Sequence, residues 1–125
     1  MVSRILDSHQ HFWRYSPQKY PWIGEDMNVL KNDFLPAELG EIYASQGVSG
    51  SIAVQAEQSE EETGFLLDLA DEHPYIMGVV GWVDLQNPQL SSRLEHYSSK
   101  KKLRGFRHLI QDEPDRNFIL NPAFQ

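Results

Sequence analysis

Cysteine is absent from this chain of 125 residues. Neither a disulfide framework nor thiolate chemistry is therefore expected. Long apolar runs are also missing, because no stretch approaches the length that crosses a bilayer. The first residues form no apolar signal segment, since Arg4 and Asp7 interrupt them. These absences favour a cytoplasmic location and predict no membrane partner.

Positive charge is scarce. The chain has 11 Lys and Arg against 18 Asp and Glu, a formal net charge of −7. Nucleic acids and anionic membranes bind basic surfaces, so neither is an expected partner. The one basic cluster, Lys100 to Lys102 with Arg104, is short and has no interleaved aromatic residues. It therefore indicates a solvated loop.

Short apolar segments alternate with helix signals along the chain. The expected strands are Ile5–Ser8, Ser51–Gln55, Ile76–Val83 and Leu103–His108. The expected helices begin at Pro36, at a capping box formed by Ser59 and Glu62, and at Asn87-Pro88. Gly47 and Pro74 end the first two helices, and the third runs to about Tyr97. A long loop from Phe12 to about Asp33 is rich in aromatic residues, which argues against disorder.

This βαβαβαβ order predicts an α/β fold in which four parallel strands alternate with helices. Residues 1–125 are expected to form one domain. Two architectures fit the order: a small open sheet, or the N-terminal half of a (β/α)8 TIM barrel, since a whole barrel takes roughly 250 residues.

His9-Gln10-His11 is the strongest functional signal, because it directly follows the first apolar segment. Alternate side chains of a strand point to the same face, so His9 and His11 project together. Two neighbouring imidazoles can hold a divalent metal or polarise a carbonyl group. In the alternative interpretation, one histidine packs in the core and the other is solvated.

Polar or aromatic residues also stand at the carboxyl ends of the other three strands, where barrel enzymes carry their active sites. They are Gln55, Trp82 with Asp84, and Arg107 with His108. Structural alternatives exist as well. Gln55 can cap its strand, Trp82 can belong to the core, Asp84 can begin the turn to the next helix, and Arg107 can pair with Asp112 or Glu113.

Several segments together resemble the lactonase branch of the amidohydrolase superfamily, which includes L-fuconolactonases and other sugar-lactone and dicarboxylate-lactone hydrolases. The resemblance covers nearly the whole chain. It rests on Asp7-Ser8-His9-Gln10-His11-Phe12-Trp13, Tyr20-Pro21-Trp22, Val54-Gln55-Ala56, Gly81-Trp82-Val83-Asp84-Leu85, Gly105-Phe106-Arg107-His108 and Gln111-Asp112-Glu113-Pro114.

The resemblance implies a (β/α)8 barrel in which an activated water opens a lactone to its hydroxy acid. His9 and His11 would be catalytic. They would bind one divalent metal such as zinc or, as in members that work without a metal, orient the water and the carbonyl. The implied substrate-binding residues are Tyr20, Trp22, Gln55, Trp82, Arg107 and His108.

The match is incomplete, because the family's later-strand histidine and strand-eight aspartate have no counterpart before Gln125. We therefore expect a partial barrel domain, truncated after its fourth strand and inactive alone. Its open sheet edges would favour self-association. Two other functions stay open: another reaction of the superfamily, such as decarboxylation or amide hydrolysis, and a non-catalytic remnant that serves association.

Overall fold

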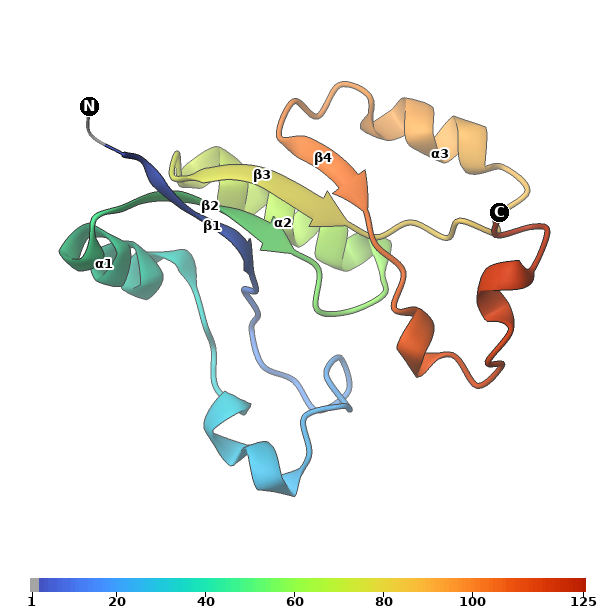
Figure 1. The fold of residues 1–125 in the computed structure, drawn as a ribbon, viewed down its shortest axis with the longest axis horizontal. Coiled ribbons are helices and arrows are strands. Elements are labelled where there is room, and N and C mark those ends of the chain that lie inside the picture. Colours follow the sequence, from blue (N-terminus) through green and yellow to red (C-terminus); the bar gives the residue numbers. More distant parts are fainter. Residues whose placement is uncertain (1–2) are drawn as a thin grey trace.

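The computed structural model describes residues 3–125 and contains one four-stranded sheet. Its strands lie in the order in which they follow along the chain, and all three neighbouring pairs are parallel. Figure 1 shows the four arrows ending on the same side of the molecule. The strands are β1 (Ile5–Gln10), β2 (Val48–Val54), β3 (Ile76–Gly81) and β4 (Leu103–Phe106). The expected parallel α/β architecture is confirmed.

Helices fill the connections between the strands, as predicted. They are α1 (Pro36–Gln46), α2 (Glu60–Glu72) and α3 (Leu90–Tyr97), with short 3₁₀ helices at Glu25–Leu30, Ile110–Asp112 and Phe118–Leu120. Pro36 stands in the first turn of α1, and Gly47 ends that helix at φ 70°, a left-handed conformation that glycine adopts readily. Ser59 caps α2, because its Oγ accepts a hydrogen bond of 3.1 Å from the Glu62 amide.

Two predicted helix starts need correction. Asn87 does not cap α3, which begins at Leu90; its Oδ1 instead accepts from the Gln89 amide and forms a turn before the helix. The capping box is also only half formed. The Glu62 carboxylate turns inward to other donors, and the Ser59 amide donates to the main-chain oxygen of Glu57.

The core lies between the sheet and α2, which runs behind β2 and β3 in Figure 1. Leu66 and Ala70 of α2 pack with Ala53, Ile76 and Val79 of the strands, and all five are fully buried. Burial of apolar area on this scale holds α2 against the sheet.

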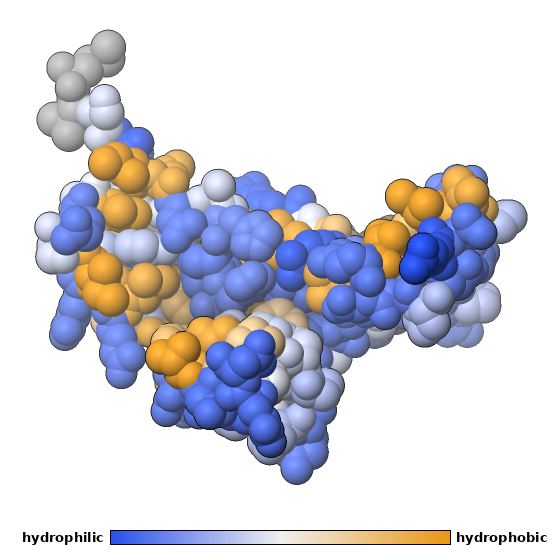
Figure 2. Space-filling model, turned by 60° about the horizontal axis from the view of Figure 1, so that its bottom comes forward, coloured by the Kyte–Doolittle hydropathy of each residue, from blue (hydrophilic) through white to orange (hydrophobic). Residues whose placement is uncertain are grey.

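β1 is an edge strand and is less buried than the sequence predicts. Ile5 and Leu6 are 53% and 52% exposed, because within residues 3–125 no strand pairs with the outer side of β1. Figure 2 shows apolar side chains gathered beside the N-terminal end of the molecule. No helix in the described part of the chain is both long enough and apolar enough to cross a membrane.

The aromatic loop after β1 is well anchored. The Trp13 and Phe34 main chains exchange two hydrogen bonds, of 3.1 and 2.9 Å, which close the loop at its base. The Trp13 indole also donates to the main-chain oxygens of Leu30 and Asn32. The expectation that this segment is ordered is therefore confirmed.

Candidate functional site

A cleft of about 240 Å³ opens where the carboxyl ends of β1, β2 and β4 converge. It brings together three of the predicted site residues, His11, Trp22 and Arg107, although they lie far apart in the sequence. The remaining lining residues are Ala56, Leu109, Gln111 and Asp112. A concave site with a few convergent polar groups on an apolar wall is the usual form of a small-molecule site.

His9 and His11 lie next to each other at the carboxyl end of β1. Their ring centroids are 5.0 Å apart, and the ring planes meet at 82°. His9 is exposed within the strand, whereas His11 follows it and is partly buried. His11 Nδ1 lies 2.8 Å from the main-chain oxygen of Val54. Since a carbonyl only accepts, Nδ1 carries the proton, and the lone pair of Nε2 is left for another partner.

The surroundings of His11 favour its neutral form. Burial lowers its pKa below 6.5, and the charges of His9 and Arg107 act in the same direction, while the bond to Val54 opposes them. A neutral imidazole is the form that binds a metal. His11 is therefore ready to act as a ligand at neutral pH.

The residues present fit part of a metal site. Zinc–nitrogen bonds are about 2.0 Å long, so two imidazoles at this separation can approach one ion. A ligating histidine commonly donates its other ring N–H to a carbonyl, as His11 does to Val54. Residues 3–125 contain no group of three or more His, Cys, Asp or Glu arranged to hold a metal, so no third ligand of these types joins the pair within them.

Arg107 and Gln55 hold each other at the far side of the cleft. Arg107 Nη2 donates to the main-chain oxygen of Gln55 and, at 3.4 Å, to its Oε1. Gln55 Nε2 donates back to the main-chain oxygen of Arg107 at 3.1 Å. Gln55 is fully buried and does more than end its strand, because it fixes the guanidinium that lines the cleft.

The alternative interpretation of Arg107 as a surface ion-pair partner is wrong. Within the described residues it forms no salt bridge with Asp112 or Glu113, and its buried Nε has no hydrogen-bond partner. Burial lowers the pKa of Arg107, and the charge of Asp112 opposes that shift. A guanidinium stays charged in proteins, so the cleft contains a cation with unused hydrogen-bonding capacity.

Trp82 and His108 lie outside the cleft lining and contact each other. The Trp82 indole donates to His108 Nδ1 at 3.3 Å, and His108 Nε2 donates to Glu113 Oε1 at 2.5 Å. The His108 ring also stacks on Phe118, with centroids 4.8 Å apart. Both ring nitrogens of His108 are thus engaged, and the structure gives this histidine a supporting position.

Tyr20 and Trp22 take opposite positions although only Pro21 separates them. Tyr20 is 3% exposed, packs with Trp13 and Ile23, and donates from its hydroxyl to Glu62 Oε1 at 3.1 Å. Trp22 is 43% exposed and lines the cleft, where its indole donates to the main-chain oxygen of Ala56 at 3.2 Å. Of the two, only Trp22 can present an aromatic face to a ligand in this cleft.

The structure adds two buried residues: Glu62, which the sequence analysis treated only as part of a capping box, and Thr63, which it did not single out. Glu62 accepts from Tyr20 and from the amides of Ala56 and Glu57. Thr63 Oγ1 accepts from the Trp82 amide at 2.8 Å and donates to the Trp82 oxygen at 2.7 Å. The sequence signal that could have indicated them is their place, as two adjacent polar residues in the first turn of the helix that follows β2.

Comparisons with known proteins identify the family and the fold of the chain. An amidohydrolase family model matches residues 6–118. An L-fucono-1,5-lactonase from Burkholderia multivorans is 52% identical over 94% of the chain, and one from Burkholderia ambifaria is 32% identical over 96%. A crystal structure of an amidohydrolase from Burkholderia multivorans with bound zinc superposes with a TM-score of 0.91 at 49% identity and covers 98% of the chain.

These relatives are much longer than the chain. It spans 40% and 41% of the two lactonases and 43% of the chain in the zinc-bound structure. The shared part includes all four strands, so the fold corresponds to the N-terminal half of the relatives' barrel, as the sequence predicts. With a family model matching most of its length, the chain belongs to the amidohydrolase family.

Proposed function

We propose that this chain supplies the first half of the active site of a sugar-lactone hydrolase, which opens a lactone of the L-fuconolactone type to its hydroxy acid. The observation that carries the proposal is the meeting of His11, Trp22 and Arg107 in one cleft. The 52% identity to an L-fucono-1,5-lactonase supports a lactone as the substrate.

His9 and His11 would hold the divalent metal. Bound there, a zinc ion would act as a Lewis acid toward the lactone carbonyl or the attacking water. The bound zinc in the related amidohydrolase structure supports this choice. The chain's own contribution is orientation, because the Val54 carbonyl keeps the proton on His11 Nδ1 and so directs Nε2 to the ligand.

Arg107 and Trp22 would bind the substrate. The Arg107 guanidinium can donate to the lactone carbonyl oxygen as negative charge develops on it, and Gln55 prevents it from swinging away. Trp22 offers an apolar face to the sugar ring. Tyr20, Trp82 and His108, which the resemblance also implies as substrate-binding residues, do not line this cleft. The strand-eight aspartate implied by the resemblance is not among residues 3–125, so no proton abstraction is assigned to them.

A chimera tests the proposal. Residues 6–118 of this chain replace the matching segment of the Burkholderia multivorans L-fucono-1,5-lactonase, and hydrolysis of L-fucono-1,5-lactone is followed by acid release. We expect turnover that is lost in His11→Ala and Arg107→Ala chimeras. A folded chimera that hydrolyses the lactone equally well without His11 would contradict the proposed site.

Location and association are part of the same proposal. The lack of cysteine and the net charge of −7 favour a cytoplasmic enzyme that binds a small molecule and no nucleic acid. Within residues 3–125 no strand pairs with the outer edge of β1 or of β4, and these edges would let copies of the chain associate. Light scattering after size exclusion measures that association directly.

A further inference from the structure

The first turn of α2 contains a buried carboxylate that the proposed reaction does not use. Glu62 is 3% exposed, and its two oxygens accept three hydrogen bonds. Oε2 accepts from the amides of Ala56 at 3.0 Å and Glu57 at 2.6 Å, and Oε1 accepts from the Tyr20 hydroxyl at 3.1 Å. Burying a carboxylate is costly, so such an arrangement indicates a specific task.

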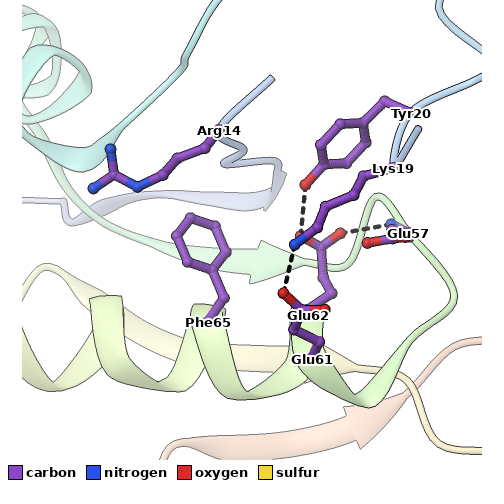
Figure 3. A pocket seen from close by; sticks show the side chains of 7 residues that line it. All are labelled: Arg14, Lys19, Tyr20, Glu57, Glu61, Glu62 and Phe65. Carbon is purple, nitrogen blue, oxygen red and sulfur yellow. Dashed lines mark hydrogen bonds and ion pairs between the residues drawn. The ribbon is translucent and has the colours of Figure 1, made fainter. Parts of the chain in front are cut away.

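Figure 3 shows how the carboxylates of this turn divide. The Tyr20 hydroxyl points down to Glu62, while the Lys19 amine reaches the neighbouring Glu61. The Lys19–Glu61 pair is 2.6 Å long but lies at the surface, where its side chains are 42% and 74% exposed. Exposed pairs of this kind contribute little. Glu62 is therefore the carboxylate that ties the loop after β1 to the segment after β2.

The hydrogen bonds of Glu62 to Tyr20 and to the Ala56 amide both lead to Trp22. Tyr20 precedes Trp22 by two residues, and Ala56 supplies the carbonyl oxygen that accepts the Trp22 indole N–H at 3.2 Å. One carboxylate thus fastens the segment that carries the indole and also the segment that receives its hydrogen bond. Glu62 itself does not line the cleft.

We propose that Glu62 is a positioning residue: through Tyr20 and the Ala56 amide it fixes Trp22 as the aromatic wall of the cleft, and so sets how tightly a ring-shaped ligand binds there. The identity of that ligand as a sugar lactone rests on the proposed function. The placement of Trp22 does not.

The first test follows the three indole N–H signals of the ¹⁵N-labelled chain by NMR. In Glu62→Gln the amide group cannot accept from all three donors, so the Trp22 signal is expected to move and its hydrogen exchange to quicken. The Trp82 signal, whose indole donates to His108 outside the cleft, serves as an internal reference. The Trp13 signal cannot serve, because its ring contacts both Tyr20 and Trp22. Glu61→Gln is the matched control, because it removes one charge from the same turn without touching the buried contacts.

Tyr20→Phe keeps the test decisive if Glu62→Gln does not fold. It removes only the hydroxyl that Glu62 accepts from, and it should move the Trp22 signal in the same direction by a smaller amount. An unmoved Trp22 signal in Tyr20→Phe and in a folded Glu62→Gln overturns the proposal. So does an equal movement in Glu61→Gln.

Titration of the wild-type chain and Glu62→Gln with L-fucono-1,5-lactone gives the functional readout. The dissociation constant is expected to rise about fivefold in Glu62→Gln, the factor that corresponds to one lost net hydrogen bond. Equal dissociation constants despite a displaced indole would overturn the link to ligand binding. If the wild-type chain binds no lactone, the proposal that this half of the site binds the substrate fails, while the indole signals still decide whether Glu62 positions Trp22.

Discussion

His11 and His108 each lie just beyond the carboxyl end of a strand, yet their ring nitrogens are used differently. His11 donates from Nδ1 to Val54 and keeps Nε2 free of the described protein groups. His108 engages both nitrogens, with Trp82 on one side and Glu113 on the other, and its ring stacks on Phe118. A histidine beyond a strand end can therefore act as a metal ligand only when its second ring nitrogen is not bonded to another protein group.

The largest difference between the two histidines is expected in zinc binding, measured by calorimetry on His11→Ala and His108→Ala. Without His11, one of the two ligands is gone, so the affinity for zinc should fall by more than about 100-fold, beyond the range that follows loss of an outer partner. His108→Ala should leave the affinity unchanged, because both of its nitrogens are occupied inside the protein. Equal losses in the two variants would abolish the distinction between them.

Substitutions of Thr63 test how much its hydrogen bonds to the Trp82 main chain contribute to stability. Thr63→Val keeps the shape but leaves the Trp82 amide and carbonyl without their side-chain partner, so unfolding free energy should drop by about 2–3 kcal/mol. Urea denaturation measures the loss. Thr63→Ser retains the hydroxyl and should lose clearly less. An equal loss in Thr63→Ser would contradict the assignment of this stability to the two hydrogen bonds of the hydroxyl.

The buried position of His11 predicts that the stability of the fold depends on pH. Because burial lowers the pKa of His11 in the folded state below its unfolded value of 6.5, the unfolded chain binds more protons in between. His11 should therefore destabilise the fold as the pH falls through 6.5, and the effect should level off below the lowered pKa. Comparing unfolding curves of wild type and His11→Asn between pH 7.5 and pH 5 isolates this increment, since Asn can still donate to Val54. The opposite slope would mean that the charged form is favoured.

The smallest effect is expected for a substitution at the N-terminal end of β1, which should change self-association without changing zinc binding. Leu6 is 52% exposed on the edge strand, far along β1 from the cleft. Leu6→Lys should reduce self-association in light scattering, because a charge on an edge opposes strand pairing. Stability should change by less than about 0.5 kcal/mol, as for most surface substitutions. Zinc affinity should stay the same, and a loss of zinc binding would show that the two ends of β1 are not independent.

The sequence supplied the element types and their order, because apolar segments, Ser59 and Gly47 act locally. It placed boundaries less well. β3 ends at Gly81 and not at Val83, and β4 ends at Phe106 and not at His108, since pairing with the neighbouring strand decides where a ladder stops. Ile5 and Leu6 look like core residues in sequence, yet their exposure depends on whether another strand covers them.

The sequence predicted which residues belong to the candidate site, but not which of them line the cleft and which lie outside it. His11, Trp22 and Arg107 meet in the cleft, whereas Tyr20 and His108 turn away from it. No local pattern distinguishes Tyr20 from Trp22, because the outcome depends on Glu62, a residue more than forty positions further along the chain. Long-range partners of this kind become visible only when the strands are brought together.

The sheet has one more consequence, for the way the protein is made. Strands that are neighbours in the sheet are also consecutive in the chain, so the earlier partner of each new strand has already been synthesised when that strand leaves the ribosome. Synthesis delivers the N-terminal part first, at about 5–20 residues per second, which leaves ample time for each βα unit to dock before the next appears. A pause in translation would then leave a narrower sheet of the same pairing, in place of strands waiting for distant partners.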